Sequence, residues 1–525
     1  MSKDILEKRK KKLVGWWEGW WSNNYNKIFL AIFIFAIILR FYFFLQTLDQ
    51  AIWWDAGDYL NHAKRIAGKF SFYYPFNPRR PFLLALIWAF LMKIGFNEVA
   101  LRFTEFLFSI AAIPAMYLIG KKMYNEKVGL ISSFLLTIFW QHLFFSCRLM
   151  TEIPTLTLFL FSVYFFWRYI EEDKAKMLWL FSLFLGLAFL ARAGTLVMFA
   201  VFPLFVFIKD KFKIFLNKKL WLSAFLIFLV MSSFFIFIFF TEHVNPITRF
   251  LCISKSWCKD VETGKTRETR FEHIMGPEGI LEYIKFMPAY FGWILLLFFS
   301  IGIIIHFLNL ILGLDLIFKN NKNMLKEVFL LLWWFIPFIY HAIFVWMMSP
   351  RYIIMSFPPF FILTSRALLQ VGKWLKKYEK SIALIIIILV LILGAYYQIK
   401  QANTMIELKK ISYKEIKDSG LWLKQNSNPQ DIIISMSKPQ HTYYAERKVY
   451  QPERNLTDFE KQIKKIKPTY LVLSIFEKHP SWLYTYPQEH NQTLIPVKAY
   501  YQNNQPILVI YRFNYTNTTL MQKNS

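Results

Sequence analysis

Runs of roughly 20 predominantly apolar residues recur along the chain, and each is long enough to cross a bilayer as an α-helix. Apolar residues make up 56% of the 525 residues and charged residues only 18%, against roughly 25% charged in soluble domains. A soluble domain could not bury so much apolar surface. We therefore predict a polytopic α-helical membrane protein with about 11 spans. The apolar runs start near Ile28, Ala100, Val128, Ile153, Met177, Thr195, Leu220, Pro288, Val328, Tyr352 and Ile382.

One further apolar stretch, from Pro81 to Gly95, is short for a span, with about 15 residues or about 22 Å of helix. If it lies in the membrane plane, the short lysine-containing connections all fall on the cytoplasmic side, as the positive-inside rule requires. We therefore predict a first outer loop over residues 48–97 that contains in-plane helices, and another outer loop over 242–287. The connections on which this depends are residues 120–127, 171–176, 209–219, 319–326 and 373–380.

Composition divides the chain into three regions. Residues 1–27 are basic and aromatic and are expected in the cytoplasm, and residues 28–400 form the transmembrane region. Residues 401–525 are more polar and predict an extracytoplasmic α/β domain, with helices that begin at capping boxes at Ser412 and Thr457. Three apolar runs in this domain read as buried strands; they are residues 431–437, 469–476 and 506–513.

The formal net charge of +28 indicates an anionic partner. Anionic lipid headgroups at the membrane surface account for this charge, and we expect no nucleic-acid partner. Cys252 and Cys258 fall in the outer loop 242–287, where an oxidising compartment would allow a short disulfide. Cys147 reads as a packed residue.

Two carboxylates follow the first span directly. Asp55 and Asp58 lie one helical turn apart in the segment WWDAGDYLNHAKRIAGK. A carboxyl group beside tryptophans at a membrane surface is partly desolvated, which tends to raise its pKa and suits a general base. Alternatively, the acids only begin a helix over 58–68 and favour its dipole. His62, four residues after Asp58, is a candidate partner for it.

The predicted outer segments also carry arginine, whereas the inner connections are almost purely lysine. A guanidinium group can bind two phosphate oxygens at once, so these arginines are candidates for a lipid-phosphate site. Alternatively, each one anchors its own helix at the membrane surface. Glu152 is expected on the same helix face as Arg148, where it either pairs with Arg148 or orients an acceptor or a metal. The candidate arginines are Arg79, Arg80, Arg148, Arg192 and Arg351.

Taken in order, these motifs resemble the GT-C superfamily of membrane glycosyltransferases. The resemblance rests on D-x-x-x-Y from Asp55 to Tyr59, the R-R-P segment that follows, and the later stretches CRLMTEIP, LARAG and PRYIIMSFPPF. The resemblance covers roughly residues 28–370, and it depends on the order of the motifs rather than on any single one. Within the superfamily the chain looks most like the branch of protein O-mannosyltransferases and lipid A aminoarabinose transferases.

The resemblance implies inverting transfer of a sugar from a polyprenyl-phosphate donor to a hydroxyl of a protein, lipid or glycan at the outer membrane face. Asp55 matches the family's general base, but Ala56 stands where the family usually has a second acid, and Asp58 is the nearest replacement. Arg148 and Arg351 match arginines of the family. Only some members use a divalent metal, so the resemblance leaves open whether this chain binds one. The alternative function is a transporter or lipid flippase, which would place charged residues near the bilayer midplane.

Overall fold

The computed structural model describes residues 18–259, 266, 269, 274–345 and 348–515. Residues 1–17 of the predicted cytoplasmic segment therefore lie outside the described residues. The chain divides into two compact units. The first, called the helical unit here, comprises Met1–Gln46, Arg102–Phe240 and Val244–Ile406. The second, called the mixed unit, comprises Thr47–Leu101, Thr241–His243 and Glu407–Ser525.

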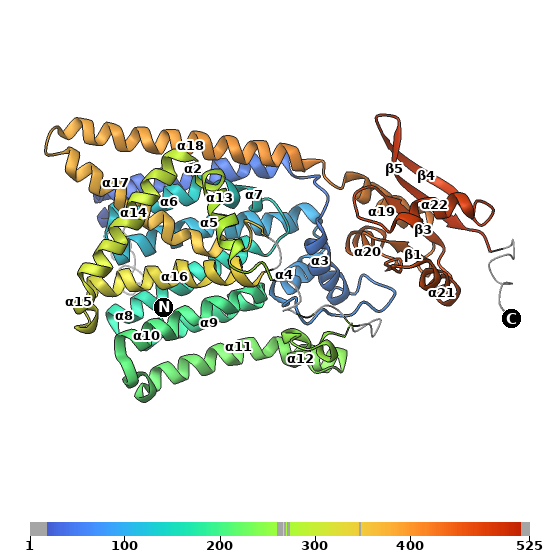
Figure 1. Cartoon of the computed structure of the whole chain (residues 1–525), viewed down its shortest axis with the longest axis horizontal. Helices are drawn as coiled ribbons and strands as arrows, with labels where there is room; N and C mark the ends of the chain where they lie inside the picture. Colours follow the sequence, from blue (N-terminus) through green and yellow to red (C-terminus); the bar gives the residue numbers. More distant parts are fainter. Residues whose placement is uncertain (1–17, 260–265, 267–268, 270–273, 346–347, 516–525) are drawn as a thin grey trace, which may run out of the picture. The chain divides into compact units, whose positions relative to one another are not determined.

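Nine helical segments among the described residues are long and apolar enough to cross a membrane (Figure 1). The predicted membrane fold is therefore confirmed. The segments are α2 (Asn24–Gln46), α5 (Glu98–Met123), α8 (Glu152–Glu172), Ala193–Leu216 with α10 (Val201–Asp210), α11 (Lys218–Glu242), α14 (Trp293–Leu312), α16 (Lys322–Phe344), Ile354–Leu375 with α17 (Phe357–Leu375), and Lys380–Asn426 with α18 (Lys380–Lys410).

Three predicted spans differ from simple long helices. The run near Met177 forms α9 (Ala175–Ala191), which has 17 residues. The run near Val128 is divided into α6 (Glu126–Ile138) and α7 (Trp140–Phe145). The predicted start near Pro288 is a few residues early, because Pro288 lies inside α13 (Glu278–Phe291) and α14 begins only at Trp293. Gly292, which separates these two helices, has φ 71°, a conformation that glycine adopts readily.

The helical unit is packed largely by aromatic side chains. Helices α8 and α9 lie side by side (Figure 1), and Phe166 of α8 contacts Phe181 of α9 and Phe329 of α16. A buried polar group joins three further helices, since Glu327 of α16 pairs with His306 of α14 at 2.6 Å and with Arg366 of α17 at 2.7 Å. Buried charges need such partners, so this group fixes how the three helices pack.

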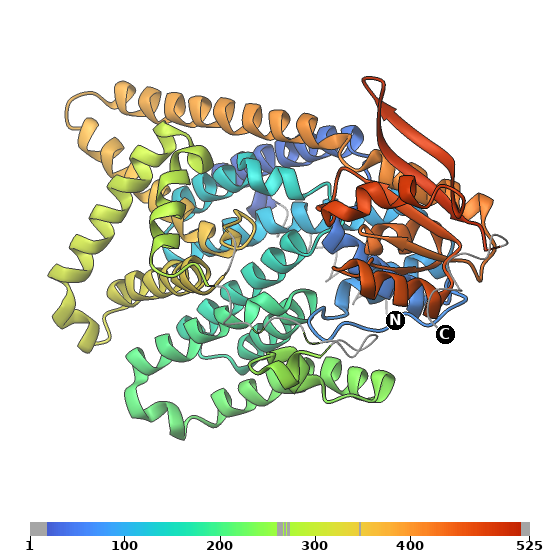
Figure 2. The same ribbon diagram turned by 45° about the vertical axis from the view of Figure 1, so that its right-hand side comes forward.

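The mixed unit contains a five-stranded sheet with strand order β2-β1-β3-β5-β4. Figure 2 shows the C-terminal strands, in red and orange, from a second direction. The three strands β2, β1 and β3 are parallel, and β5 pairs antiparallel with both β3 and β4. All three predicted strands are present, as β1, β3 and β5, which confirms the α/β domain. The bounds are β1 (Ile432–Ser435), β2 (Lys448–Tyr450), β3 (Tyr470–Ser474), β4 (Leu494–Gln502) and β5 (Gln505–Phe513).

The helices of this domain begin close to the predicted places but with other caps. Helix α19 (Lys414–Asn426) has Tyr413 at its N-cap, and α21 (Leu456–Ile466) has Asn455. The predicted caps at Ser412 and Thr457 are therefore wrong. Asn455 Oδ1 accepts a hydrogen bond from the Asp458 backbone N–H at 2.8 Å, so an asparagine already caps the helix ahead of Thr457.

The predicted first outer loop folds within the mixed unit together with the C-terminal domain. It contains α3 (Trp54–Ile66) and α4 (Leu83–Lys93). With 11 residues, α4 is about 16 Å long and too short to span a bilayer. Helix α3 packs against α20 (Lys438–Ala445) of the C-terminal domain.

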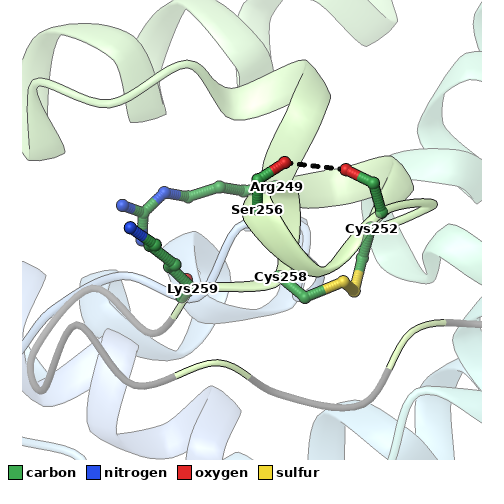
Figure 3. Close-up of a disulfide and its surroundings, with 6 residues drawn as sticks. Arg249, Cys252, Ser256, Cys258 and Lys259 are labelled. Carbon is green, nitrogen blue, oxygen red and sulfur yellow. Dashed lines mark hydrogen bonds between the residues drawn. A yellow bond between two sulfur atoms is a disulfide. The ribbon is translucent and has the colours of Figure 1, made fainter.

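The predicted outer loop 242–287 contains α12 (Pro246–Leu251) and the 3₁₀ turn η3 (Lys255–Cys258). Cys252 and Cys258, whose pairing the sequence left open, form a disulfide that closes this segment (Figure 3). Arg249 Nη1 also donates a hydrogen bond to the Lys259 carbonyl at 2.9 Å. Cys147 is buried, as expected of a packed residue.

Candidate active site

Asp55 and Asp58 lie in the N-terminal half of α3, and both contact Arg80. Arg80 Nη2 is 2.6 Å from Asp55 Oδ1 and 3.3 Å from Asp58 Oδ2. Burial alone would lower the pKa of Arg80, but the two carboxylates, with Tyr59 nearby, raise that pKa well above its usual range. A guanidinium in contact with a carboxylate favours the ionised form of the acid, which is the form that accepts a proton. This contact acts against the desolvation that the sequence suggested for the base.

The segment that carries Arg80 is attached to α3 through His62. The Asn77 backbone N–H donates to His62 Nε2 at 3.1 Å, and Asn77 Oδ1 accepts from the Arg79 backbone N–H at 3.0 Å. Burial, with Arg80 and Arg65 nearby, lowers the pKa of His62 to about 3. The expected pairing of His62 with Asp58 is therefore wrong, because the ring is neutral near pH 7 and accepts a hydrogen bond from the loop.

A second cluster in the mixed unit centres on Glu242, the last residue of α11. Its buried carboxylate accepts hydrogen bonds from Arg65 Nη1 at 2.5 Å, from the Tyr73 hydroxyl, and from the Phe76 backbone N–H at 3.0 Å. The Arg65 guanidinium also lies 4.0 Å from the centroid of the Phe76 ring. This Glu242 cluster fixes the segment that leads to Arg80. Sequence reasoning missed it, because Glu242 lies 177 residues from Arg65.

Replacing Glu242 with glutamine should destabilise the mixed unit. The substitution removes the negative charge opposite Arg65, and breaking a buried ion pair costs up to about 3–5 kcal/mol. We expect the lower end of that range, because the Arg65 side chain keeps 21% exposure. Glu282→Gln is a matched control, since its exposed pair with Lys285 contributes about 0–1 kcal/mol. Thermal unfolding in detergent measures the difference, and equal melting temperatures would contradict the expected role.

The helical unit brings Arg192, Arg351 and Glu152 onto one group of side chains. Arg192, the C-cap residue of α9, donates from Nη1 to Glu152 Oε1 at 2.5 Å and to Thr151 Oγ1 at 3.2 Å. Its guanidinium carbon lies 5.8 Å from the ring centroid of Tyr352. Arg351 Nη2 donates to the Tyr352 hydroxyl at 3.3 Å. Two arginines chosen from the sequence therefore lie near one tyrosine, and Arg192 also binds the acid Glu152. We call Arg192, Arg351, Tyr352, Glu152 and Thr151 the Tyr352 cluster.

Arg148 is buried in the same unit. Its Nη1 donates to the Phe144 carbonyl at 2.5 Å, and its guanidinium carbon is 3.6 Å from the centroid of the Phe144 ring. The expectation that Arg148 and Glu152 share a helix face is wrong, because α7 ends at Phe145 and α8 begins only at Glu152. Glu152 instead pairs with Arg192, 40 residues further along the chain.

Tyr352 and Thr151 are members of the Tyr352 cluster that sequence reasoning did not select. Tyr352 follows Arg351 directly, so the R-Y pair was the available signal. Metal ligation was left open by the sequence. In the part of the chain that the structure describes, no three His, Cys, Asp or Glu side chains come together to hold an ion.

Comparison with known proteins was made by sequence and by structure. The family described as dolichyl-phosphate-mannose-protein mannosyltransferase (PMT_2) matches residues 79–237. No curated protein matched the sequence at a significant level. Among solved structures, the apo form of ArnT from Cupriavidus metallidurans is similar, with a TM-score of 0.63 and 11% identity over 92% of this chain and 97% of that one.

Two further solved structures contain lipid phosphates. ArnT bound to undecaprenyl phosphate has a TM-score of 0.61 and 11% identity, again over 92% of this chain and 97% of that one. The oligosaccharyltransferase AglB from Archaeoglobus fulgidus, in complex with an inhibitory peptide and a dolichol-phosphate, has a TM-score of 0.59 and 14% identity over 88% of this chain and 70% of that one. The resemblance seen in the sequence is thereby confirmed, and the chain has the fold of the GT-C superfamily of membrane glycosyltransferases.

Proposed function

We propose that the chain is an inverting glycosyltransferase that moves a sugar from a polyprenyl-phosphate donor to an acceptor hydroxyl at the outer membrane face. The observation that carries the proposal is the contact of one Arg80 nitrogen with both Asp55 and Asp58, in the loop after the first apolar helix. The fold supports it, because structures with this fold contain undecaprenyl phosphate or dolichol-phosphate. The acceptor is a protein, a lipid or a glycan.

Asp55 is proposed as the general base. It takes the proton of the acceptor hydroxyl as that oxygen forms a bond to the anomeric carbon of the sugar. The bond from the same carbon to the lipid-phosphate oxygen breaks, its electron pair leaves with the phosphate, and the configuration inverts. Arg80 supports this role, because its contact with Asp55 at 2.6 Å favours the ionised carboxylate. Asp58 is then the second acid at this site.

Arg192 and Arg351 of the Tyr352 cluster are proposed to bind the lipid phosphate, with Arg148, Arg79 and Arg80 as further candidates. Negative charge develops on the phosphate as the sugar leaves, and donors placed there stabilise the transition state more than the ground state. A guanidinium has five N–H donors, and Glu152 and Thr151 contact only Nη1 of Arg192. Glu152 therefore orients Arg192, and the same contact compensates the buried charge of Glu152.

The direct test is turnover of radiolabelled polyprenyl-phosphate sugars, supplied one at a time with different sugars, by membranes that contain the full chain. In membranes that contain the chain, we expect the label of one donor to move from the polyprenyl lipid to an acceptor, which is either a non-lipid molecule or another lipid. Membranes that lack the chain should show no such transfer. Proton NMR of the first product should show the inverted anomer. If no donor is turned over and the labelled lipid instead changes leaflet, the transporter or flippase reading replaces the proposal.

The proposed sidedness has a separate test. The disulfide between Cys252 and Cys258 supports an oxidising compartment for this segment. After mild reduction of intact cells, a membrane-impermeant maleimide should label these cysteines. A cysteine introduced at Asn323, in a predicted inner connection, should react only after the cells are opened. The reverse pattern would place Asp55 on the cytoplasmic side and contradict the proposed site.

A further inference from the structure

Helix α20 of the C-terminal domain contacts α3 so closely that one position of α3 has no room for a side chain. A Cβ atom built on Gly57 would lie 2.8 Å from Pro439 Cβ and 3.0 Å from the Pro439 carbonyl carbon. Real Cβ atoms do not approach other atoms this closely, so any other residue at position 57 would move the helices apart. Gly57 lies between Asp55 and Asp58 in the sequence.

Two polar side chains of α3 bind the same partner helix. Asn61, whose side chain is fully buried, donates from Nδ2 to the Pro439 carbonyl at 2.8 Å. Lys64 Nζ lies 2.6 Å from both the Tyr443 carbonyl oxygen and Glu446 Oε1. These bonds fix α3 along its axis, whereas the Gly57 contact fixes its distance from α20.

The spacing of these residues shows how the contact orients the carboxylates. Gly57, Asn61 and Lys64 are separated by four and three residues, so they form one stripe along α3. At about 100° per residue, Asp58 and Asp55 lie about 100° and 160° around the helix from Gly57. The stripe that binds α20 therefore directs both acids away from it, toward Arg80.

We propose that α20 is the element that positions the general base, with Gly57, Asn61 and Lys64 as positioning residues. This inference rests on the proposed function, and it gives the C-terminal domain a defined role in the reaction. A shift of about 1 Å in a reacting group can cost about 100-fold in rate. The chemical step is therefore sensitive to this contact. The donor phosphate is assigned first to Arg192 and Arg351 of the Tyr352 cluster, which do not belong to α3 or α20, so its binding should be affected little.

Gly57→Ala tests the inference, and Gly19→Ala is the matched control because a Cβ there meets nothing within 4 Å. Membranes with each variant are assayed with the radiolabelled polyprenyl-phosphate sugar that the wild type turns over. We expect Gly57→Ala to lower kcat by about 10- to 100-fold and to change the KM for the donor by less than about twofold. Combining Gly57→Ala with Pro439→Gly, which removes the clashing Cβ, should recover part of kcat.

Hydrogen exchange of the solubilised full chain gives a readout that does not depend on activity. Amides of α3 should exchange faster in Gly57→Ala than in the wild type or in Gly19→Ala. Unchanged exchange, or faster exchange with unchanged kcat, would overturn the inference while leaving the proposed function in place. Absence of transfer by the wild type would overturn the proposed function and the inference with it.

If Gly57→Ala does not accumulate in membranes, the same measurements are made with Lys64→Met, and Lys64→Arg is the conservative control. Arginine keeps the charge opposite Glu446, so we expect Lys64→Arg to retain most of the kcat that Lys64→Met loses. An equal kcat for Lys64→Met and the wild type would overturn the positioning role of Lys64.

Discussion

Asp55→Asn is expected to lower the rate of sugar transfer by about 10²–10⁴-fold, the usual contribution of a general base. Asparagine has nearly the same shape, and its Oδ1 can still accept the hydrogen bond from Arg80 that Asp55 accepts at 2.6 Å. An amide, however, cannot take up the proton of the attacking hydroxyl. The loss should therefore appear in kcat, measured as initial label transfer at saturating donor in membranes with equal amounts of protein.

The controls for this prediction separate the base from its neighbour and from a general loss of charge. Asp315→Asn changes an exposed carboxylate that pairs with Lys319 and should leave transfer unchanged. Asp58→Asn should cost less than Asp55→Asn, because Arg80 lies 3.3 Å from Asp58 and 2.6 Å from Asp55. A larger loss in Asp58→Asn would move the role of base to Asp58. Equal transfer by Asp55→Asn and the wild type would contradict the assignment.

The sequence predicted secondary structure best where it depends on the hydropathy of residues that are neighbours in the chain. The apolar run around Ile432–Ser435 is bounded by polar residues, and it forms the predicted strand β1. The breaks inside apolar runs were not predictable from hydropathy. Phe139 and Gly292 interrupt helices within continuously apolar sequence, and only the backbone conformation at each residue shows the break. Span positions were therefore predicted well, whereas some helix ends were not.

The candidate site was only partly predictable, because its contacts join residues far apart in the sequence. Spacing rules cover side chains three or four residues apart, but neither pair considered on that basis forms. Arg148 and Glu152 lie outside a continuous helix, and His62 accepts a hydrogen bond from Asn77 rather than pairing with Asp58. Arg192 contacts Glu152 from 40 residues away, and Glu242 contacts Arg65 from 177 residues away. Arg192 and Arg351 were selected because topology does not explain arginine in the predicted outer turns, and in the structure both lie near the ring of Tyr352.

Arg192→Lys is expected to lower kcat/KM for the lipid donor by at least about tenfold, approaching the 10²–10³-fold cost of removing one transition-state donor. Lysine keeps a positive charge near Glu152, whose side chain is fully buried. Complete removal of the charge would leave that carboxylate unpaired, at a cost of about 3–5 kcal/mol in stability. Lysine cannot, however, offer two parallel N–H groups to a phosphate. Initial rates over a range of donor concentrations measure the effect.

The matched control is Arg168→Lys, since Arg168 also pairs with a glutamate, Glu172, but lies at the other end of α8 from Glu152. This substitution should leave kcat/KM unchanged. If Arg192 served only to anchor α9, Arg192→Lys would lower the melting temperature and leave the KM for the donor at its wild-type value. If Arg192 binds the phosphate, kcat/KM for the donor falls at an unchanged melting temperature. A bidentate contact to the donor exists only when the donor is bound. Loss of phosphate binding therefore changes the kinetics with the donor, whereas loss of a helix anchor changes the melting temperature.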